Sequence, residues 1–64
     1  MKQIEIFFFY RRKKIAIEFT SQAPRKGDEV RIRRRIYKVD IVVWCYDEKL
    51  ESSFERVNIG LTKA

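Results

Sequence analysis

A chain of 64 residues with one cysteine, no histidine and a net charge of +6 has room for one small domain, which we assign to residues 1–64. A chain of this size buries roughly 60% of the surface that its unfolded form exposes, so a deep substrate pocket is not expected. A disulfide within the chain needs two cysteines and a structural zinc site needs several cysteine or histidine ligands, so the composition excludes both. The stability must therefore come from an apolar core or from a partner chain.

The basic residues are concentrated in the first half of the chain. Residues 1–35 carry eleven lysines and arginines against four acidic residues, a balance of +7, whereas residues 36–64 carry four against five, a balance of −1. Such an uneven distribution is informative about binding partners, because a concentrated field attracts molecules of the opposite charge.

Two features of the sequence indicate a cytoplasmic protein. The apolar stretch near the N-terminus contains Glu5 and continues into a basic segment, which is not the pattern of a secretory signal. The single cysteine, Cys45, is typical of a reducing compartment. No segment approaches the ~18 apolar residues that a transmembrane helix requires, so no membrane partner is expected.

Two strands are predicted before residue 21. In residues 2–10 apolar side chains recur at every second position, and from Phe7 onward the opposite face becomes apolar as well. Residues 11–14 form a charged connection. The segment that follows has its large apolar residues on one parity, so it predicts a second strand that pairs with the first as a hairpin. These apolar residues are Ile15, Ile17 and Phe19.

A loop and a third strand come next. Residues 21–28 hold the only proline and one of the two glycines, so they form the clearest loop of the chain. The third strand begins at Glu29, with Val30 and Ile32 facing the core and the intervening arginines facing solvent. A tight turn without glycine is expected at Arg34–Arg35.

The longest apolar stretch, from Ile36 to Tyr46, is dense in β-branched and aromatic residues and predicts the central strand. Its alternation breaks in the middle, and a β-bulge near Asp40 and Ile41 would restore a single apolar face. The residues on that face would be Val39, Val42 and Trp44.

An acidic, polar excursion over residues 47–53 separates the central strand from the last one. The final strand is predicted from Phe54 to Thr62, with Val57, Ile59 and Leu61 facing inward. Gly60 interrupts this strand and indicates a bulge or a close approach of another backbone.

Five strands joined in chain order predict an all-β fold, namely a five-stranded antiparallel meander that forms a small SH3-like or partly open barrel. The pattern Pro24-x-x-Gly27-Asp28-x-Val30-x-Ile32, followed by Ile36-Tyr37-x-Val39-x-x-Val42-x-Trp44, resembles the first hairpin of SH3-like small β-barrels. It is also similar to short proteins encoded by phages and mobile elements. The resemblance covers residues 24–44 and implies a fold rather than a function, because small barrels host many unrelated roles.

The sequence offers no catalytic or metal-binding constellation. Without histidine, Cys45 is the one obvious nucleophile, and its place inside an apolar strand indicates a small core residue. Asp47, Glu48 and Glu51 lack the glycine-anchored spacing of a calcium loop, so a solvated acidic loop is favoured. There is no glycine-rich phosphate loop. We therefore expect a binding module without enzymatic activity, cofactor or metal.

Three basic clusters contain the candidate binding residues. Arg31, Arg33 and Arg35 fall on one parity of a strand, so we expect them to project from one face at intervals of roughly 6 to 7 Å, close to the spacing of successive phosphates. Arginine suits this role because its planar guanidinium binds phosphate in a bidentate manner. The remaining candidates are Arg11, Arg12, Lys13, Lys14, Arg25, Lys26 and Tyr37.

These residues predict binding to nucleic acid, DNA or RNA, through the phosphate backbone and with weak sequence specificity. Tyr10, Tyr37 and Tyr46 carry a polar tip, so we expect them to be partly exposed and able to stack on unpaired bases. Two alternatives remain open. The charges would keep a small apolar barrel soluble and protect its edge strands, or they would dock a phage-type adaptor or inhibitor on an acidic surface of a host protein.

The predicted first strand also bears on assembly. It is apolar on both faces from Phe7 to Tyr10, whereas one small sheet offers a single core. The second face therefore needs a cover, either from closure of the barrel or from another subunit. We expect a homodimer.

Overall fold

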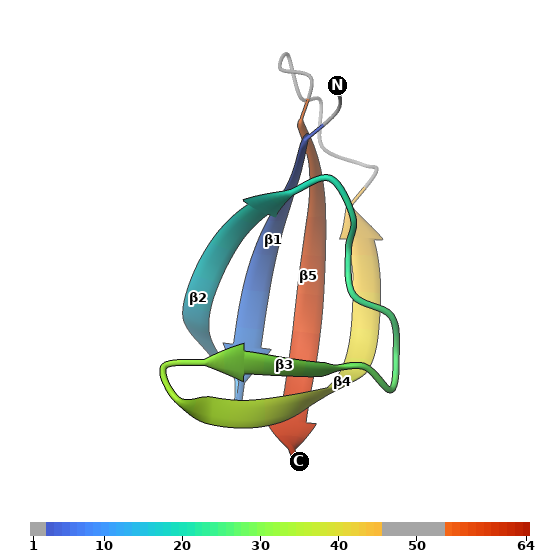
Figure 1. The fold of residues 1–64 in the computed structure, drawn as a ribbon. Helices are drawn as coiled ribbons and strands as arrows, with labels where there is room; N and C mark the ends of the chain where they lie inside the picture. Colours follow the sequence, from blue (N-terminus) through green and yellow to red (C-terminus); the bar gives the residue numbers. More distant parts are fainter. Residues whose placement is uncertain (1–2, 46–53) are drawn as a thin grey trace.

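The computed structural model describes residues 3–45 and 54–64, and it is built from five strands (Figure 1). The strands are β1 (Gln3–Tyr10), β2 (Lys13–Thr20), β3 (Glu29–Ile32), β4 (Arg35–Cys45) and β5 (Phe54–Lys63). No helix occurs within these two ranges. The predicted all-β class and the five strands are confirmed. Tyr46 and the acidic excursion over residues 47–53 lie outside the described residues.

The five strands form one mixed sheet that curls into a half-barrel, in the order β2-β1-β5-β4-β3. The pairs β1–β2, β3–β4 and β4–β5 are antiparallel, but β1 and β5 run parallel. The partly open barrel is thus confirmed, whereas the purely antiparallel meander was wrong. The meander fails because the segment between β2 and β3 crosses the open side of the barrel to the far edge of the sheet, and β5 inserts beside β1 (Figure 1).

The core lies on the concave face of the sheet and is supplied by its three inner strands. Ile6, Val39, Val57 and Ile59 are almost fully buried, and the remaining buried residues of the described ranges are Ile4, Phe8, Tyr37 and Leu61. The central strand of the sheet is β5 and not, as predicted, β4. Both β5 and its neighbour β1 alternate strictly between this face and the outer one. Val57, Ile59 and Leu61 face inward as their parity predicts.

A β-bulge in β4 keeps that strand's apolar residues on the core face. Its pairing with β5 shifts between Val39 and Ile41, opposite Gly60, so the bulge predicted near Asp40 and Ile41 is confirmed. After it, Val42 and Trp44 pair with Ile59 and Val57 and share their face. The bulge lets β4 bend, because the first part of the strand pairs with β3 and the second part continues along β5.

A second bulge changes the faces of β2. The β1–β2 register shifts between Phe8 and Phe9, so that Phe8 pairs with Ala16 and Phe9 with Lys14. Ile15 is therefore the extra residue, and both Ile15 and Ala16 pack against the core. The single apolar face expected from the shared parity of Ile15, Ile17 and Phe19 was wrong, because one extra residue reverses the parity of everything beyond it. Their side chains lie on the outer face and are about half exposed.

The loop of residues 21–28 is tied to the middle of β4. The backbone N–H of Gly27 donates to the carbonyl oxygen of Val39 at 2.8 Å, and the N–H of Val39 donates to the carbonyl oxygen of Asp28 at 2.8 Å. Gly27 has a φ of 96°, a conformation that favours glycine. A carboxylate oxygen of Asp28 accepts the backbone N–H of Arg25 at 2.8 Å. The loop thereby fixes the point at which β3 begins.

The burial of β5 generates a stability prediction. Ile59 has an exposed fraction of 0%, so Ile59→Ala should lower the free energy of unfolding by roughly 2 to 5 kcal/mol through lost burial and a residual cavity. Ile36 is 46% exposed on β4, and Ile36→Ala is the matched control, with an expected change within about 1 kcal/mol. Urea unfolding followed by circular dichroism measures both. Equal losses for the two variants would contradict this assignment of the core.

Candidate nucleic-acid interface

Two hairpin turns, each formed by a pair of arginines, dominate the charged surface. Arg11 and Arg12 connect β1 to β2, with Tyr10 pairing with Lys13. Arg33 and Arg34 connect β3 to β4. The φ angles of the four arginines are 52°, 66°, 52° and 70° in chain order. Two-residue turns with positive φ at both positions match the twist of antiparallel strands, which is why hairpins of this length are tight.

Arginine is an unusual choice at these positions. Asn–Gly is the preferred sequence for a turn with two positive φ angles, because a side chain with a Cβ atom costs roughly 1 to 2 kcal/mol in the left-handed conformation. All four turn arginines have positive φ, so this cost in free energy applies at each of the four positions. Strained backbone of this kind is typical of functional sites, where the side chain is needed at the strained place.

The fold brings the two turns to the same end of the barrel. Tyr10 directly precedes the first turn, and its ring lies 5.0 Å from the ring of Tyr37, with an interplanar angle of 59°. Tyr37 follows the second turn by two residues of β4. The β3–β4 hairpin consequently crosses the end of the barrel where β1 stops and β2 begins (Figure 1).

We call the surface formed by residues 11–14 and 31–35 the basic end. These two segments contain no acidic residue, and every cationic side chain in them is exposed. The eight cations are Arg11, Arg12, Lys13, Lys14, Arg31, Arg33, Arg34 and Arg35. Eight positive charges at one end of a small domain produce a field that attracts a polyanion.

An aromatic ring supports one of the turn arginines. The guanidinium carbon of Arg11 lies 5.3 Å from the centre of the Tyr10 ring, a cation–π distance. The ring of Tyr10 also contacts the ring of Tyr37. The pair of tyrosines therefore joins the two turns and orients Arg11.

The predicted row of Arg31, Arg33 and Arg35 does not exist as a single face. The turn falls at Arg33–Arg34, one residue earlier than predicted, so that Ile32 pairs with Arg35 and Arg31 pairs with Ile36. Cross-strand partners share a face. Arg31 thus lies on the outer face beside Ile36, and Arg35 lies on the same face as the inward-directed Ile32. Arg33 belongs to the turn itself.

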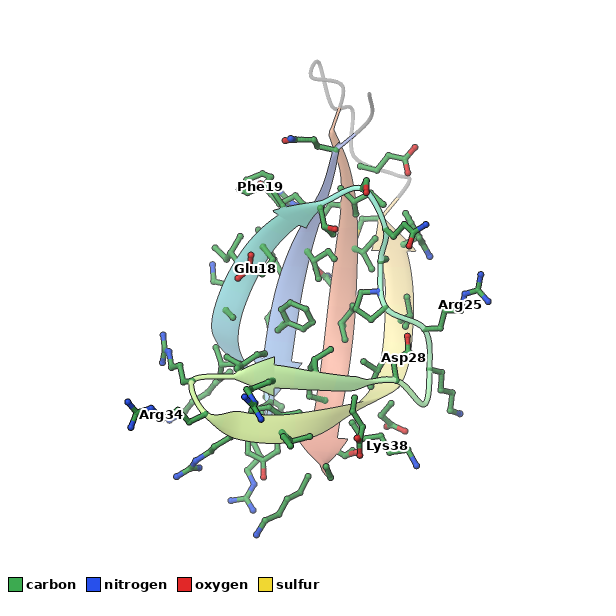
Figure 2. All side chains as sticks on the ribbon, in the orientation of Figure 1. Glu18, Phe19, Arg25, Asp28, Arg34 and Lys38 are labelled. Atoms are coloured by element: carbon green, nitrogen blue, oxygen red, sulfur yellow. The ribbon has the colours of Figure 1, made fainter. Side chains whose placement is uncertain are left out.

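Other predicted site residues lie elsewhere. Tyr37 is only 9% exposed and belongs to the core, so its predicted exposure was wrong, whereas Tyr10 is half-buried as expected. Arg25 and Lys26 line an open groove of about 800 Å³ together with Val42 and Trp44. Figure 2 shows Arg25 and Arg34 on opposite sides of the molecule. The cluster of Arg25 and Lys26 is therefore separate from the basic end.

Arg34 was absent from the candidate residues predicted from the sequence, although it occupies the tip of the second hairpin (Figure 2). The signal that identifies it is the repetition of Arg–Arg between two strand-forming segments, with neither glycine nor asparagine in the pair. Two-residue hairpin loops favour type I′ turns, in which both residues have positive φ, and both side chains then belong to the surface of the turn.

The described ranges hold no group of three or more potential metal ligands, and none of their elements is a helix able to cross a membrane. In comparisons with known proteins, no family model, no curated protein and no solved structure matched the chain. The likeness to SH3-like barrels of phages and mobile elements therefore stays a prediction.

The strain in the second turn can be measured as stability. Replacing Arg33 and Arg34 with Asn and Gly should raise the free energy of unfolding by about 1 kcal/mol, because this pair adopts positive φ at little cost. The variant Arg33→Gln/Arg34→Gln removes the same two charges but keeps both Cβ atoms. Urea unfolding should show a clearly larger gain for Asn–Gly. Equal stability of the two variants would assign the effect to charge repulsion instead of backbone strain.

Proposed function

We propose that this domain binds nucleic acid through the phosphate backbone and that the basic end is its contact surface. The observation that carries the proposal is the set of four arginines at positive φ in two turns that meet at one end of the barrel. The need for a soluble surface does not by itself account for arginine at these positions. Asparagine and glycine would also keep the protein soluble, and they would relieve the backbone strain.

The chemistry of the side chains supports phosphate as the ligand. Six of the eight cations of the basic end are arginines, whose guanidinium groups donate parallel hydrogen bonds to two oxygens of one phosphate. The short, hydrogen-bonded hairpins fix the backbone from which these side chains project. Less conformational entropy is therefore lost on binding than for a disordered basic tail. A chain of phosphates offers several contacts at once.

The same surface offers little for reading bases. The described ranges contain no helix to enter a major groove, and Tyr10 is packed between Tyr37 and Arg11. Contacts to phosphate position a protein on nucleic acid but carry no sequence information. Weak sequence specificity and a strong dependence on salt therefore belong to the proposal, as does a cytoplasmic location, where nucleic acid is accessible.

Salt titration tests the proposal directly. Fluorescence anisotropy with labelled single-stranded and duplex 20-mers, at salt concentrations from ~50 to ~250 mM, gives the slope of log affinity against log salt. Each phosphate contact adds about 0.7 to 0.9 to this slope. Arg12→Gln/Arg34→Gln, with one change in each turn, should reduce the slope by about 1.4 to 1.8 units.

The matched control is Arg25→Gln/Lys26→Gln, which removes the same charge from the opposite side of the molecule. This variant should keep the slope of the wild type. An equal reduction in both variants would mean that net charge alone attracts the ligand. Absence of binding at ~50 mM salt would refute the proposal, and retention of one stoichiometric protein from a nuclease-treated lysate would favour docking on an acidic protein surface.

A further inference from the structure

The outer face of the sheet carries apolar side chains on β2, β1 and β4, with Asn58 and Gly60 of β5 lying between those of β1 and β4. Ile17 of β2 pairs with Phe7 of β1, Phe7 with Asn58 of β5, and Asn58 with Val43 of β4. Cross-strand partners share a face, so these four residues form one row across the sheet. Ile17 and Val43, at its two ends, are 45% and 48% exposed.

Neighbouring rows extend this surface. On one side lie Phe9, Gly60 and Ile41, which are successive cross-strand partners. On the other side Phe19 pairs with Glu5, and Phe19 projects from the outside of β2 (Figure 2). We call this surface the outer patch. Its members are Phe7, Phe9, Ile17, Phe19, Ile41 and Val43, arranged around Asn58.

The outer patch is nearly neutral in a protein of charge +6. Glu5 accepts a hydrogen bond from the Nε of Arg56 at 3.0 Å, and both side chains are partly buried. The guanidinium of Arg56 and the ammonium of Lys14 lie 4.7 and 4.8 Å from the centre of the Phe7 ring. Two copies of this protein repel each other at their basic ends, but this face opposes close approach far less.

A polar atom without a partner lies at the middle of the patch. The Oδ1 atom of Asn58 is inaccessible to solvent and has no hydrogen-bond partner, which costs free energy in a folded protein. A half-turn about the last torsion of Asn58 exchanges the positions of Oδ1 and Nδ2, so either atom can be the one directed outward. In a twofold-symmetric contact, a residue at the axis faces its own copy, so with Asn58 at the centre of the contact the amide Nδ2 of one copy can donate to the Oδ1 of the other.

We infer that a second copy of this chain covers the outer patch and that the two sheets pack outer face to outer face around the Asn58 pair. Four strands at a spacing of about 4.8 Å give a patch about 19 Å wide. With a similar length along the strands, two such faces bury on the order of 1,000 Å² in total, near the lower bound for specific interfaces. Dimerisation should therefore occur at micromolar concentrations. Lys14 of the basic end reaches the outer patch, where its ammonium lies over the Phe7 ring, but neither arginine turn belongs to the patch, so the inference does not rest on the proposed function.

Sedimentation tests the dimer with two matched variants of β4. At ~100 μM the wild type should sediment at twice its chain mass of 7.8 kDa. Val43→Glu places an unpaired charge in the outer patch and should weaken dimerisation at least tenfold. Ile36→Glu makes the same kind of change on the same outer face, but beside Arg31 and away from the patch, and should leave the dimer intact. If Val43→Glu fails to fold, Ile17→Glu on β2 repeats the test.

The side-chain amide of Asn58 gives a second readout. Asn58 is the only asparagine of the chain, so its NH₂ resonances are identified in a ¹⁵N spectrum by a single substitution, Asn58→Asp. They should shift with protein concentration in the wild type and in Ile36→Glu, but not in Val43→Glu. A wild type that remains monomeric at ~100 μM, or equal dimerisation of Val43→Glu and Ile36→Glu, would overturn the inference.

Discussion

The parallel pairing of β1 with β5 is the interaction on which the rest of the structure depends. The β1–β2 hairpin and the β3–β4–β5 unit are each local, and neither has a complete core of its own. Pairing Gln3 through Tyr10 with Phe54 through Leu61 places the most deeply buried residues of both units, Ile6, Val57 and Ile59, next to one another. The half-barrel, its concave core and its outer face are all defined at this seam.

The seam also determines where the turns lie. Because β1 and β4 lie on opposite sides of β5, Tyr10 and Tyr37 come into contact. The two hairpin turns next to these tyrosines therefore lie at the same end of the barrel. The basic end is thus a product of long-range topology, although each of its turns is formed by two adjacent residues. The two turns combine strained backbone with like charges, and contacts on both sides of the turns hold them in place. Backbone ladders hold the strands in register, and the tyrosine pair and its contact with Arg11 hold the turns together.

Alternation and turn composition predicted much of the fold. The strand segments, the loop at residues 21–28, the bulge beside Asp40 and the inward face of β5 all follow from local pattern, because strict period-2 burial leaves few alternatives. Two of the failures share a cause, which is a shift of a single residue. Ile15 as an extra residue reverses Ile17 and Phe19, and a turn at Arg33–Arg34 in place of Arg34–Arg35 separates Arg31 from Arg35. Which strands pair across the sheet could not be predicted, since the β1–β5 contact joins segments about fifty residues apart and local periodicity does not specify partners.

The same seam has a consequence for how the chain acquires its structure. Its two strands stand near opposite ends of the sequence, so nearly the whole chain must be closed into a loop before the central pairing forms, and the entropy of that closure is lost before the core compensates for it. Folds dominated by such distant contacts fold slowly for their size. During synthesis the β1–β2 hairpin therefore leaves the ribosome with Ile4, Ile6 and Phe8 uncovered, and it has no sheet to join until β5 has emerged.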